Sequence, residues 1–419
     1  MEKALLVSIK FKTEKTGWSM DDVVNELEEL TRACGAQIVD HVNCFCEKPA
    51  PRFFVGKGKA EEIALAAAEE GADTVIFSRD LSGTQQRNLE EVIGKKTIDR
   101  TQLILDIFAR HAKTPEGKTQ VELAQLQYLM PRLVGQGIIL SRLGGGIGTS
   151  GPGEQKLEVD RRRIRKRIDR LRVDLRHLSL HRQTLRKQRK ENAVPTVALV
   201  GYTNAGKSTL INTLTHAGQL VQDSLFTTLD PLAQGLKLSG GGTVVISDTV
   251  GFLNNLPHHL IEAFKATLEE VIEADLLIHV LDAGHPLVRE YAKAVYAVLK
   301  ELHVEEKPMI TALNKIDLVE NKAWIDRLAQ ESVNPVPISA KFGINLDQLL
   351  ARVGEFLEPK MLSLDLVIPH RRMDLVDIFY RQGQVKDIKY MQKGIEIKVS
   401  LPKIVAAKLL KDKDIERIC

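Results

Sequence analysis

Residues 196–208 read TVALVGYTNAGKS, and this stretch decides the fold of the central part of the chain. The apolar run TVALV predicts a buried strand, and Gly201–Ser208 matches the pattern G-x-x-x-x-G-K-[ST] in full. Glycines in such a turn let consecutive backbone N–H groups point at a phosphate, at the start of a helix. Lys207 can reach the β- and γ-phosphates of a nucleotide, and the Ser208 hydroxyl can bind Mg²⁺. The stretch therefore predicts a nucleotide-binding phosphate loop between a strand and a helix.

Two further segments supply predicted contacts to magnesium, phosphate and base. The apolar run VVIS delivers Asp248, which suits a carboxylate near a magnesium ion, and Gly251 can present its N–H to a γ-phosphate. The segment Asn314–Asp317 reads NKID and follows an apolar strand. The Asp317 carboxylate can accept from guanine N1–H and from the exocyclic amine, a pair of donors that adenine lacks. The Ala340 N–H, in the segment PISAK, can meet guanine O6. GTP is therefore predicted rather than ATP.

The order of these motifs resembles the translation-factor class of GTPases, and the wider sequence is similar to the HflX family of ribosome-associated GTPases in the Obg/HflX branch. The similarity includes FFVGKGKAEEI from Phe53, IDRTQLILDIFARHAKTPEGKTQVELAQL from Ile98, and GGGIGTSGPGEQKLEVDRR from Gly144. FTTLDP, residues 226–231, resembles the switch I segment of this branch. The resemblance covers most of the chain.

This resemblance implies bound GTP or GDP, with Mg²⁺ held by Ser208 and by a switch I threonine, for which Thr228 is favoured and Thr227 is the alternative. Asn204 resembles an asparagine that binds K⁺ in some GTPases. Phe252 stands where many Ras-type GTPases have a glutamine that orients the attacking water, so we expect slow intrinsic hydrolysis that ribosomes stimulate. No side chain is assigned a catalytic role. The implied nucleotide-binding residues are Gly201, Tyr202, Thr203, Asn204, Ala205, Gly206, Lys207, Ser208, Thr209, Phe226, Thr227, Thr228, Leu229, Asp230, Asp248, Thr249, Val250, Gly251, Asn314, Lys315, Ile316, Asp317, Ser339, Ala340 and Lys341.

Composition is that of an ordinary globular protein. The 419 residues include 27% charged and 43% hydrophobic residues, and no run approaches 18 apolar residues, so no membrane span is indicated. The N-terminus has no apolar run long enough for a signal peptide. The four cysteines are therefore expected as reduced thiols in a cytoplasmic protein, which we expect to be a monomer.

Alternating strand and helix patterns divide the chain into four predicted domains. Residues 1–100 predict a small parallel sheet with helices packed on it. Residues 101–193 predict an antiparallel hairpin of long helices with apolar seams and a glycine-rich tip near residues 143–153. Residues 194–358 form the predicted GTPase domain, and residues 359–419 form a short α+β domain. The predicted fold class is therefore α/β with several domains.

The second helix of the hairpin concentrates positive charge. Residues 155–192 contain 15 Lys or Arg and five Asp or Glu, a net charge of +10 in a chain whose total is +4. Too few acids are present for i,i+4 pairing to neutralise this helix, so a polyanionic partner is predicted. The candidate RNA contacts are Gly145, Gly146, Gly148, Arg161, Arg162, Arg163 and Arg165.

The hairpin tip contains G-x-G-x-x-G over Gly146–Gly151, the spacing of a dinucleotide-binding turn. Pro152 and Gly153 follow at once, and a basic helix occupies the region where an acid should cap a second strand. The tip is therefore interpreted as a surface for RNA and not as a cofactor site.

The HflX resemblance implies a factor that binds the large ribosomal subunit and its rRNA and that splits or rescues stalled ribosomes under stress. It also implies that the N-terminal region reaches toward the peptidyl-transferase centre. Two alternatives stay open at this point: a regulatory GTPase whose hairpin binds a protein or an anionic membrane, and an RNA-modification enzyme that uses GTP as a switch. The hairpin has no wide Trp- or Phe-lined face, which disfavours membrane insertion. No catalytic residue set for RNA modification is found outside the predicted GTPase domain.

Overall fold

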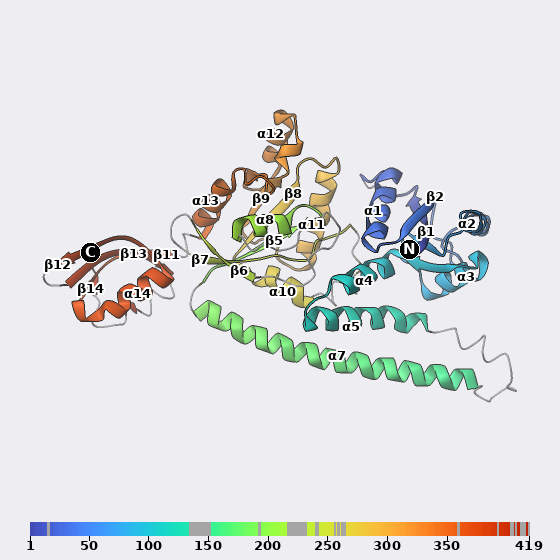
Figure 1. Cartoon of the computed structure of the whole chain (residues 1–419), viewed down its shortest axis with the longest axis horizontal. Helices are drawn as coiled ribbons and strands as arrows, with labels where there is room; N and C mark the ends of the chain where they lie inside the picture. The colour runs from blue at the N-terminus through green and yellow to red at the C-terminus, as the bar shows by residue number, and fades with distance from the viewer. Residues whose placement is uncertain are drawn as a thin grey trace. The chain divides into compact units, whose positions relative to one another are not determined.

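The computed structural model contains three separate sheets (Figure 1). It describes residues 1–14, 17–133, 152–191, 194–215, 233–238, 243–254, 257, 260, 265–357, 361–391, 394–402, 406, 409–410 and 416–417. The described residues form two compact units, of which the first contains Met1–Leu178 and the second contains most of the remaining chain. A parallel N-terminal sheet, a helical hairpin, a phosphate-loop domain and a small C-terminal sheet confirm the predicted fold class.

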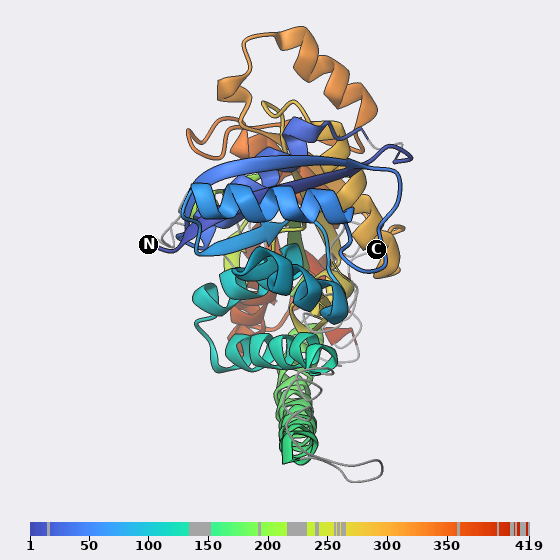
Figure 2. The same cartoon turned by 90° about the vertical axis from the view of Figure 1, so that its right-hand side faces the viewer.

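The N-terminal sheet is parallel throughout and has the strand order β2-β1-β3-β4. Its strands are β1 (Lys3–Phe11), β2 (Gln37–Cys46), β3 (Thr74–Phe77) and β4 (Lys96–Asp99). The helices packed on it are α1 (Met20–Ala33), α2 (Lys57–Glu69), α3 (Gly83–Ile93) and α4 (Arg100–His111). Helices α2 and α3 cover the face that carries Leu5, Val7 and Ile9, and Figure 2 shows α2 lying across this sheet. The Ser82 hydroxyl accepts the Gln85 N–H and caps α3, as its sequence predicts.

A buried carboxylate joins this sheet to the next helix, α5 (Pro115–Arg132). Asp99 ends β4 and is fully buried, yet each of its oxygens has two donors. One oxygen accepts from the Gln102 N–H at 2.9 Å and the Tyr128 hydroxyl at 2.8 Å. The other accepts from the Leu81 N–H at 3.0 Å and the Arg132 guanidinium at 2.9 Å. Because a buried charge is tolerated only when it is paired and hydrogen-bonded, this cluster fixes the end of α5 against the sheet.

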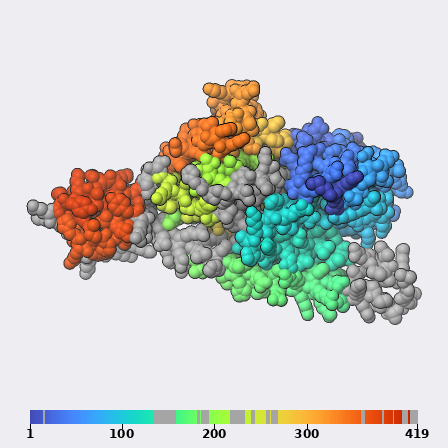
Figure 3. Space-filling view, viewed as in Figure 1, coloured from blue at the N-terminus to red at the C-terminus, as the bar shows by residue number. Residues whose placement is uncertain are grey.

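Helix α5 pairs with the long basic helix α7 (Pro152–Glu191), which runs antiparallel to it in Figure 1. Leu123 of α5 packs against Ile168 and Leu171 of α7, and all three side chains are buried. These positions belong to the apolar seams seen in the sequence, so the predicted hairpin is confirmed. Figure 3 shows the side chains of α7, in green, as an exposed ridge along α5. Of the predicted glycine tip, residues 143–151 lie outside the described residues, and residues 152–153 begin α7.

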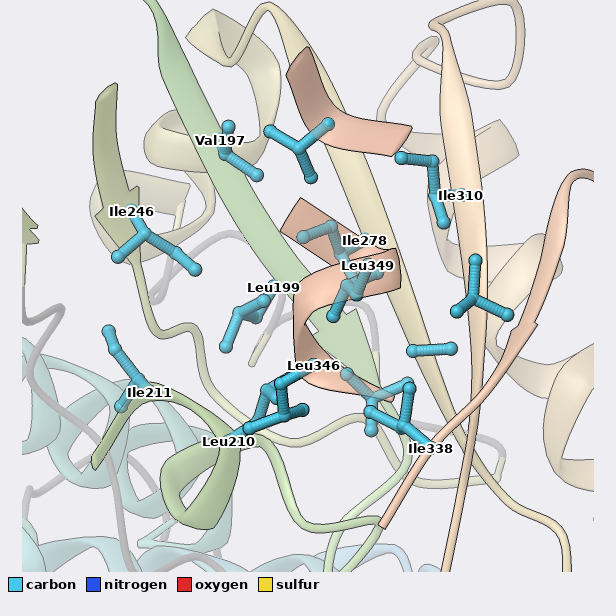
Figure 4. Packing of buried hydrophobic residues seen from close by; sticks show 14 of the residues in the cluster. Val197, Leu199, Leu210, Ile211, Ile246, Ile278, Ile310, Ile338, Leu346 and Leu349 are labelled. Carbon is cyan, nitrogen blue, oxygen red and sulfur yellow. The ribbon is translucent and has the colours of Figure 1, made fainter. Parts of the chain in front are cut away.

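The central sheet has the strand order β10-β9-β8-β5-β7-β6, and only β6 is antiparallel to its neighbour. Its strands are β5 (Thr196–Gly201), β6 (Ala233–Lys237), β7 (Thr243–Ser247), β8 (Leu276–Asp282), β9 (Met309–Asn314) and β10 (Pro335–Pro337). Its helices are α8 (Lys207–Thr215), α10 (Lys265–Glu273), α11 (Val288–Glu301), η1 (Ile316–Leu318), α12 (Lys322–Glu331) and α13 (Leu346–Leu357). Figure 4 shows Leu210 of α8 and Leu349 of α13 packed against Leu199 and Ile278 of the sheet. This apolar core supports the phosphate loop, which connects β5 to α8.

The C-terminal sheet is antiparallel, with the strand order β12-β13-β11-β14. Its strands are β11 (Met361–Ile368), β12 (Gln384–Met391), β13 (Gly394–Pro402) and β14 (Glu416–Arg417). The 3₁₀ turn η3 (His370–Arg372) leads into α14 (Met373–Gln382), whose Phe379 packs on Leu366 and Ile397 of the sheet. This domain therefore has an apolar core of its own.

Candidate functional site

The phosphate loop, residues 201–208, is shaped by glycines that no other residue can replace without displacing a neighbour. Gly206 has φ +94°, and a Cβ added there would lie 2.3 Å from the Asn314 side-chain nitrogen. A Cβ added at Gly201 would lie 2.4 Å from the Val280 carbonyl oxygen. Asn204 adopts the left-handed conformation at φ 60° and is exposed at the outside of the turn. The loop therefore has the tight backbone that the sequence pattern predicts.

Lys207 is held inside this loop. Its Nζ donates to the carbonyl oxygens of Gly201, at 3.1 Å, and Tyr202, at 2.8 Å, and its side chain is buried. Burial lowers the pKa of Lys207 to about 8, although the nearby Asp248 carboxylate opposes this shift. The ammonium group is therefore positioned by backbone carbonyls at the start of a helix, where the helix dipole also favours an anion.

Ser208 and Asp248 meet beside that lysine. The Ser208 hydroxyl donates to the Asp248 carboxylate at 2.8 Å, and the other carboxylate oxygen accepts the Thr249 N–H at 2.9 Å. Asp248 is fully buried at the end of β7. A hydroxyl and a carboxylate are the hard oxygen donors that Mg²⁺ prefers, so these residues fit that ion. Among the described residues no cluster of three or more His, Cys, Asp or Glu side chains could hold a metal alone.

The segment after Asp248 is bonded directly to the phosphate loop. The Phe252 N–H donates to the Gly201 carbonyl at 3.1 Å, and the Thr203 N–H donates to the Phe252 carbonyl at 2.9 Å. A Cβ at Gly251 would lie 2.7 Å from the Thr203 methyl group. The Phe252 side chain is 1% exposed, so its ring fills the core and supplies no group that could orient water.

The NKID and SAK segments converge on the other side of the loop. The Asn314 amide donates to the Ala205 carbonyl at 2.8 Å and accepts the Ala340 N–H at 2.9 Å. One side chain thus joins three segments. The Ala340 N–H that the sequence analysis assigned to guanine O6 is directed at Asn314, so the two acceptors would share it. Asp317 is exposed and accepts the Ser339 hydroxyl.

Comparisons with known proteins agree with this geometry. The chain is 45% identical over 400 residues to the GTPase HflX of Caldanaerobacter subterraneus subsp. tengcongensis, covering 96% of this chain and 91% of the relative. It is 43% identical over 404 residues to the GTPase HflX of Escherichia coli K12, covering 96% and 94%. The chain belongs to the HflX family of GTPases.

Family models match successive parts of this HflX chain. The model for the GTP-binding GTPase N-terminal region matches residues 21–109, and the model for the middle region matches residues 111–189. The model described as 50S ribosome-binding GTPase matches residues 196–315. A GTP-binding protein from Sulfolobus solfataricus, solved in complex with GDP, is 24% identical with a TM-score of 0.44, covering 85% of this chain and 98% of that one. As an HflX-family member, this protein binds and hydrolyses GTP.

Some predicted residues of this HflX chain lie outside the described residues, and others lie on α7. The switch I segment, residues 226–230, and the tip glycines Gly145, Gly146 and Gly148 lie outside the described residues. The arginines Arg161, Arg162, Arg163 and Arg165 lie on α7, where the last three are exposed and Arg161 is half-buried. Among the described helices, none has the length and apolarity that a membrane crossing requires.

One side chain of the HflX site, and one contact of a predicted residue, were not expected from the sequence. Asp282, at the end of β8, forms an ion pair with Lys315 of the NKID segment at 2.8 Å and fixes this lysine, whose φ is 63°. A carboxylate at the carboxyl end of a strand beside β5 was the available signal. Tyr202 lies in the phosphate loop with its ring 3% exposed and stacked on Tyr291 of α11. No local sequence pattern predicts the stacking of Tyr202 on Tyr291.

Proposed function

We propose that the cluster around the phosphate loop binds GTP through the residues of its four motifs. The N–H groups of residues 201–208 and the Lys207 ammonium receive the phosphates, Gly251 receives the γ-phosphate, and Asp317 receives the guanine edge. The buried, carbonyl-bonded Lys207 and the close approach of Gly251 to Thr203 support this assignment. The remaining motif positions given above, from Thr209 to Lys341, would complete the nucleotide contacts.

Magnesium and potassium enter this proposal through different residues. Ser208 and the switch I Thr228 would hold Mg²⁺, with Asp248 acting through water; the 2.8 Å Ser208–Asp248 contact supports that half of the site. When bound, the ion supplies a positive charge that stabilises the phosphate oxygens during hydrolysis. Asn204, exposed at the outside of the loop, would contribute to a K⁺ site. Equal GTPase rates in K⁺ and Na⁺ buffers would exclude the K⁺ role.

The partner that we propose is the large ribosomal subunit, bound in part by rRNA contacts to α7 and the hairpin tip. The observation that carries this proposal is the exposed ridge of α7, whose segment has a net charge of +10. A match to a family model described as 50S ribosome-binding GTPase supports the choice of partner. Bound GTP would order the switch segments and favour the ribosome-bound state, so that the protein splits or rescues stalled ribosomes under stress.

Cosedimentation tests this function. The protein should sediment with large subunits in the presence of a non-hydrolysable GTP analogue and should remain in the supernatant with GDP. Folded protein that stays in the supernatant with both nucleotides would contradict the proposal. A change of Gly145, Gly146 and Gly148 to Ala should weaken this cosedimentation while GTP affinity stays the same, because none of these glycines belongs to a nucleotide-binding motif.

A further inference from the structure

The residue that follows the first phosphate-loop glycine makes contacts that the nucleotide motifs do not require. Tyr202 has its ring parallel to the Tyr291 ring, with centroids 3.8 Å apart and an angle of 3° between the planes. Its hydroxyl accepts the backbone N–H of Asn254 at 3.0 Å. One side chain therefore joins the phosphate loop to α11 and to the segment that follows Gly251.

The bond to Asn254 adds to two backbone bonds that already join these segments. Tyr202 and Phe252 form a parallel bridge, in which Gly201 accepts from Phe252 and Thr203 donates to Phe252. The bridge fixes the chain at residue 252, and the Tyr202 hydroxyl fixes it again two residues later. Residues 252–254 can rotate about the bridge only if the bond between the Asn254 N–H and the Tyr202 hydroxyl breaks. The Tyr202 hydroxyl thus adds a third bond to the two that hold the residue next to Gly251 against the phosphate loop.

The Tyr291 ring has a second aromatic neighbour. The Tyr291 ring lies 4.5 Å from the His285 ring, and the Tyr291 hydroxyl lies 3.3 Å from His285 Nε2. His285 Nδ1 accepts the Leu287 N–H at 3.1 Å, so a neutral imidazole carries its proton on Nε2 and donates it to Tyr291. The chain of contacts thus runs from the β8–α11 connection through two tyrosine rings to the phosphate loop. Tyr291 is backed by His285 and cannot swing away from Tyr202 without losing that contact.

We propose that Tyr202 is a positioning residue for GTP hydrolysis: its hydroxyl holds residues 251–254 so that the Gly251 N–H stays directed at the γ-phosphate, and Tyr291 keeps its ring in place. The proposal rests on the proposed contact between Gly251 and the γ-phosphate. GDP lacks that phosphate, so the Tyr202 hydroxyl acts on the reaction of GTP and not on the binding of GDP. Because Phe252 offers no polar group, the backbone of this segment has to be held by its neighbours.

Tyr202→Phe tests the proposal, because it keeps the stacked ring and removes only the hydroxyl. The loss of one buried hydrogen bond should lower kcat for GTP about tenfold, with the Kd for GDP within about twofold of the parent value. Tyr296→Phe, on the same helix α11 but edge-on to His279, is the matched control and should leave both values unchanged. Tyr291→Leu removes the ring that stacks on Tyr202 but leaves the Tyr202 hydroxyl in place, so a smaller fall in kcat, about threefold, is expected.

Two results would overturn the proposal. An unchanged kcat in Tyr202→Phe would show that the hydroxyl does not position the reacting segment. An equal loss of GDP affinity and kcat would show that Tyr202 only supports the shape of the phosphate loop. Gly251→Ala, measured in parallel, separates this proposal from the one on which it rests. If Gly251→Ala binds GDP and hydrolyses GTP at the parent rate, the γ-phosphate contact itself is wrong; if only Gly251→Ala is impaired, the Tyr202 role alone is wrong.

Discussion

Lys207 in the phosphate loop and the arginines of α7 are cations that we assign to phosphate groups, but the protein holds them in opposite ways. Lys207 is buried and donates to two carbonyls of its own loop. Arg163 of α7 has a side chain that is 77% exposed, and its ion-pair partner among the described residues, Asp160, is 3.7 Å away. The first cation is held by the protein before a ligand arrives, while the second is exposed to solvent.

This difference separates two kinds of recognition. Added salt screens the attraction between a buried cation and a phosphate only weakly. Such a cation also selects one phosphate geometry, because the surrounding N–H groups are fixed too. Exposed arginines bind phosphates by releasing counterions, so their affinity depends steeply on salt and little on sequence. We infer that the phosphate loop gives nucleotide specificity and that α7 gives affinity for a large polyanion.

Removal of the buried cation should have the largest effect. Lys207→Ala should weaken GTP and GDP binding about 100-fold or more. It removes a charge-assisted hydrogen bond to the phosphates, and a water molecule in the buried space would not replace the lost charge. Calorimetric titration with each nucleotide measures the loss, and the unfolding temperature shows whether the variant folds. A loss of nucleotide binding below about threefold would mean that Lys207 is not a phosphate ligand.

Removal of exposed cations of α7 should weaken binding to the large ribosomal subunit and leave nucleotide binding unchanged. Four exposed arginines of α7 have no acidic partner among the described residues: Arg162, Arg165, Arg170 and Arg176. Their replacement by Gln should weaken large-subunit binding about 30-fold near 0.1 M salt and reduce the slope of log K against log salt by about 3. The Kd for GTP should not change. The matched control removes four exposed cations of α11, α12 and α13: Lys293, Lys300, Arg327 and Arg352. Equal losses in the two variants would indicate nonspecific attraction.

The pH dependence of nucleotide affinity should show a smaller effect. Burial lowers the pKa of Lys207 to about 8, so the free protein carries this charge at pH 7 and largely lacks it at pH 9. Binding of a phosphate requires the charged form, so above about pH 8 it must take up a proton, and the Kd for GDP should rise about tenfold from pH 7 to pH 9. Lys207→Arg does not titrate in this range and should give a flat profile if it binds. A flat profile for the parent protein would contradict the buried ammonium.

The same two regions show what a sequence can reveal about this fold. The phosphate loop and the seams of the hairpin are local patterns, so Gly206, Lys207 and Leu123 could be placed from their spacing alone. Strand β4 gives no clear local pattern, because only four residues form it and tertiary pairing with β3 defines it. The contacts of Asp99 with Arg132 and of Tyr202 with Tyr291 join residues that are 33 and 89 positions apart. Side chains at such separations meet only through the fold, so no motif could predict them.

GTP hydrolysis with and without large ribosomal subunits tests most directly whether the two regions act together. Phe252 provides no group to orient water, so the protein alone should turn over slowly. Large subunits should stimulate the rate about tenfold or more, and the four-arginine variant should need a higher subunit concentration to reach the same maximum. An identical rate with and without saturating subunits, in protein that binds GTP normally, would contradict the account.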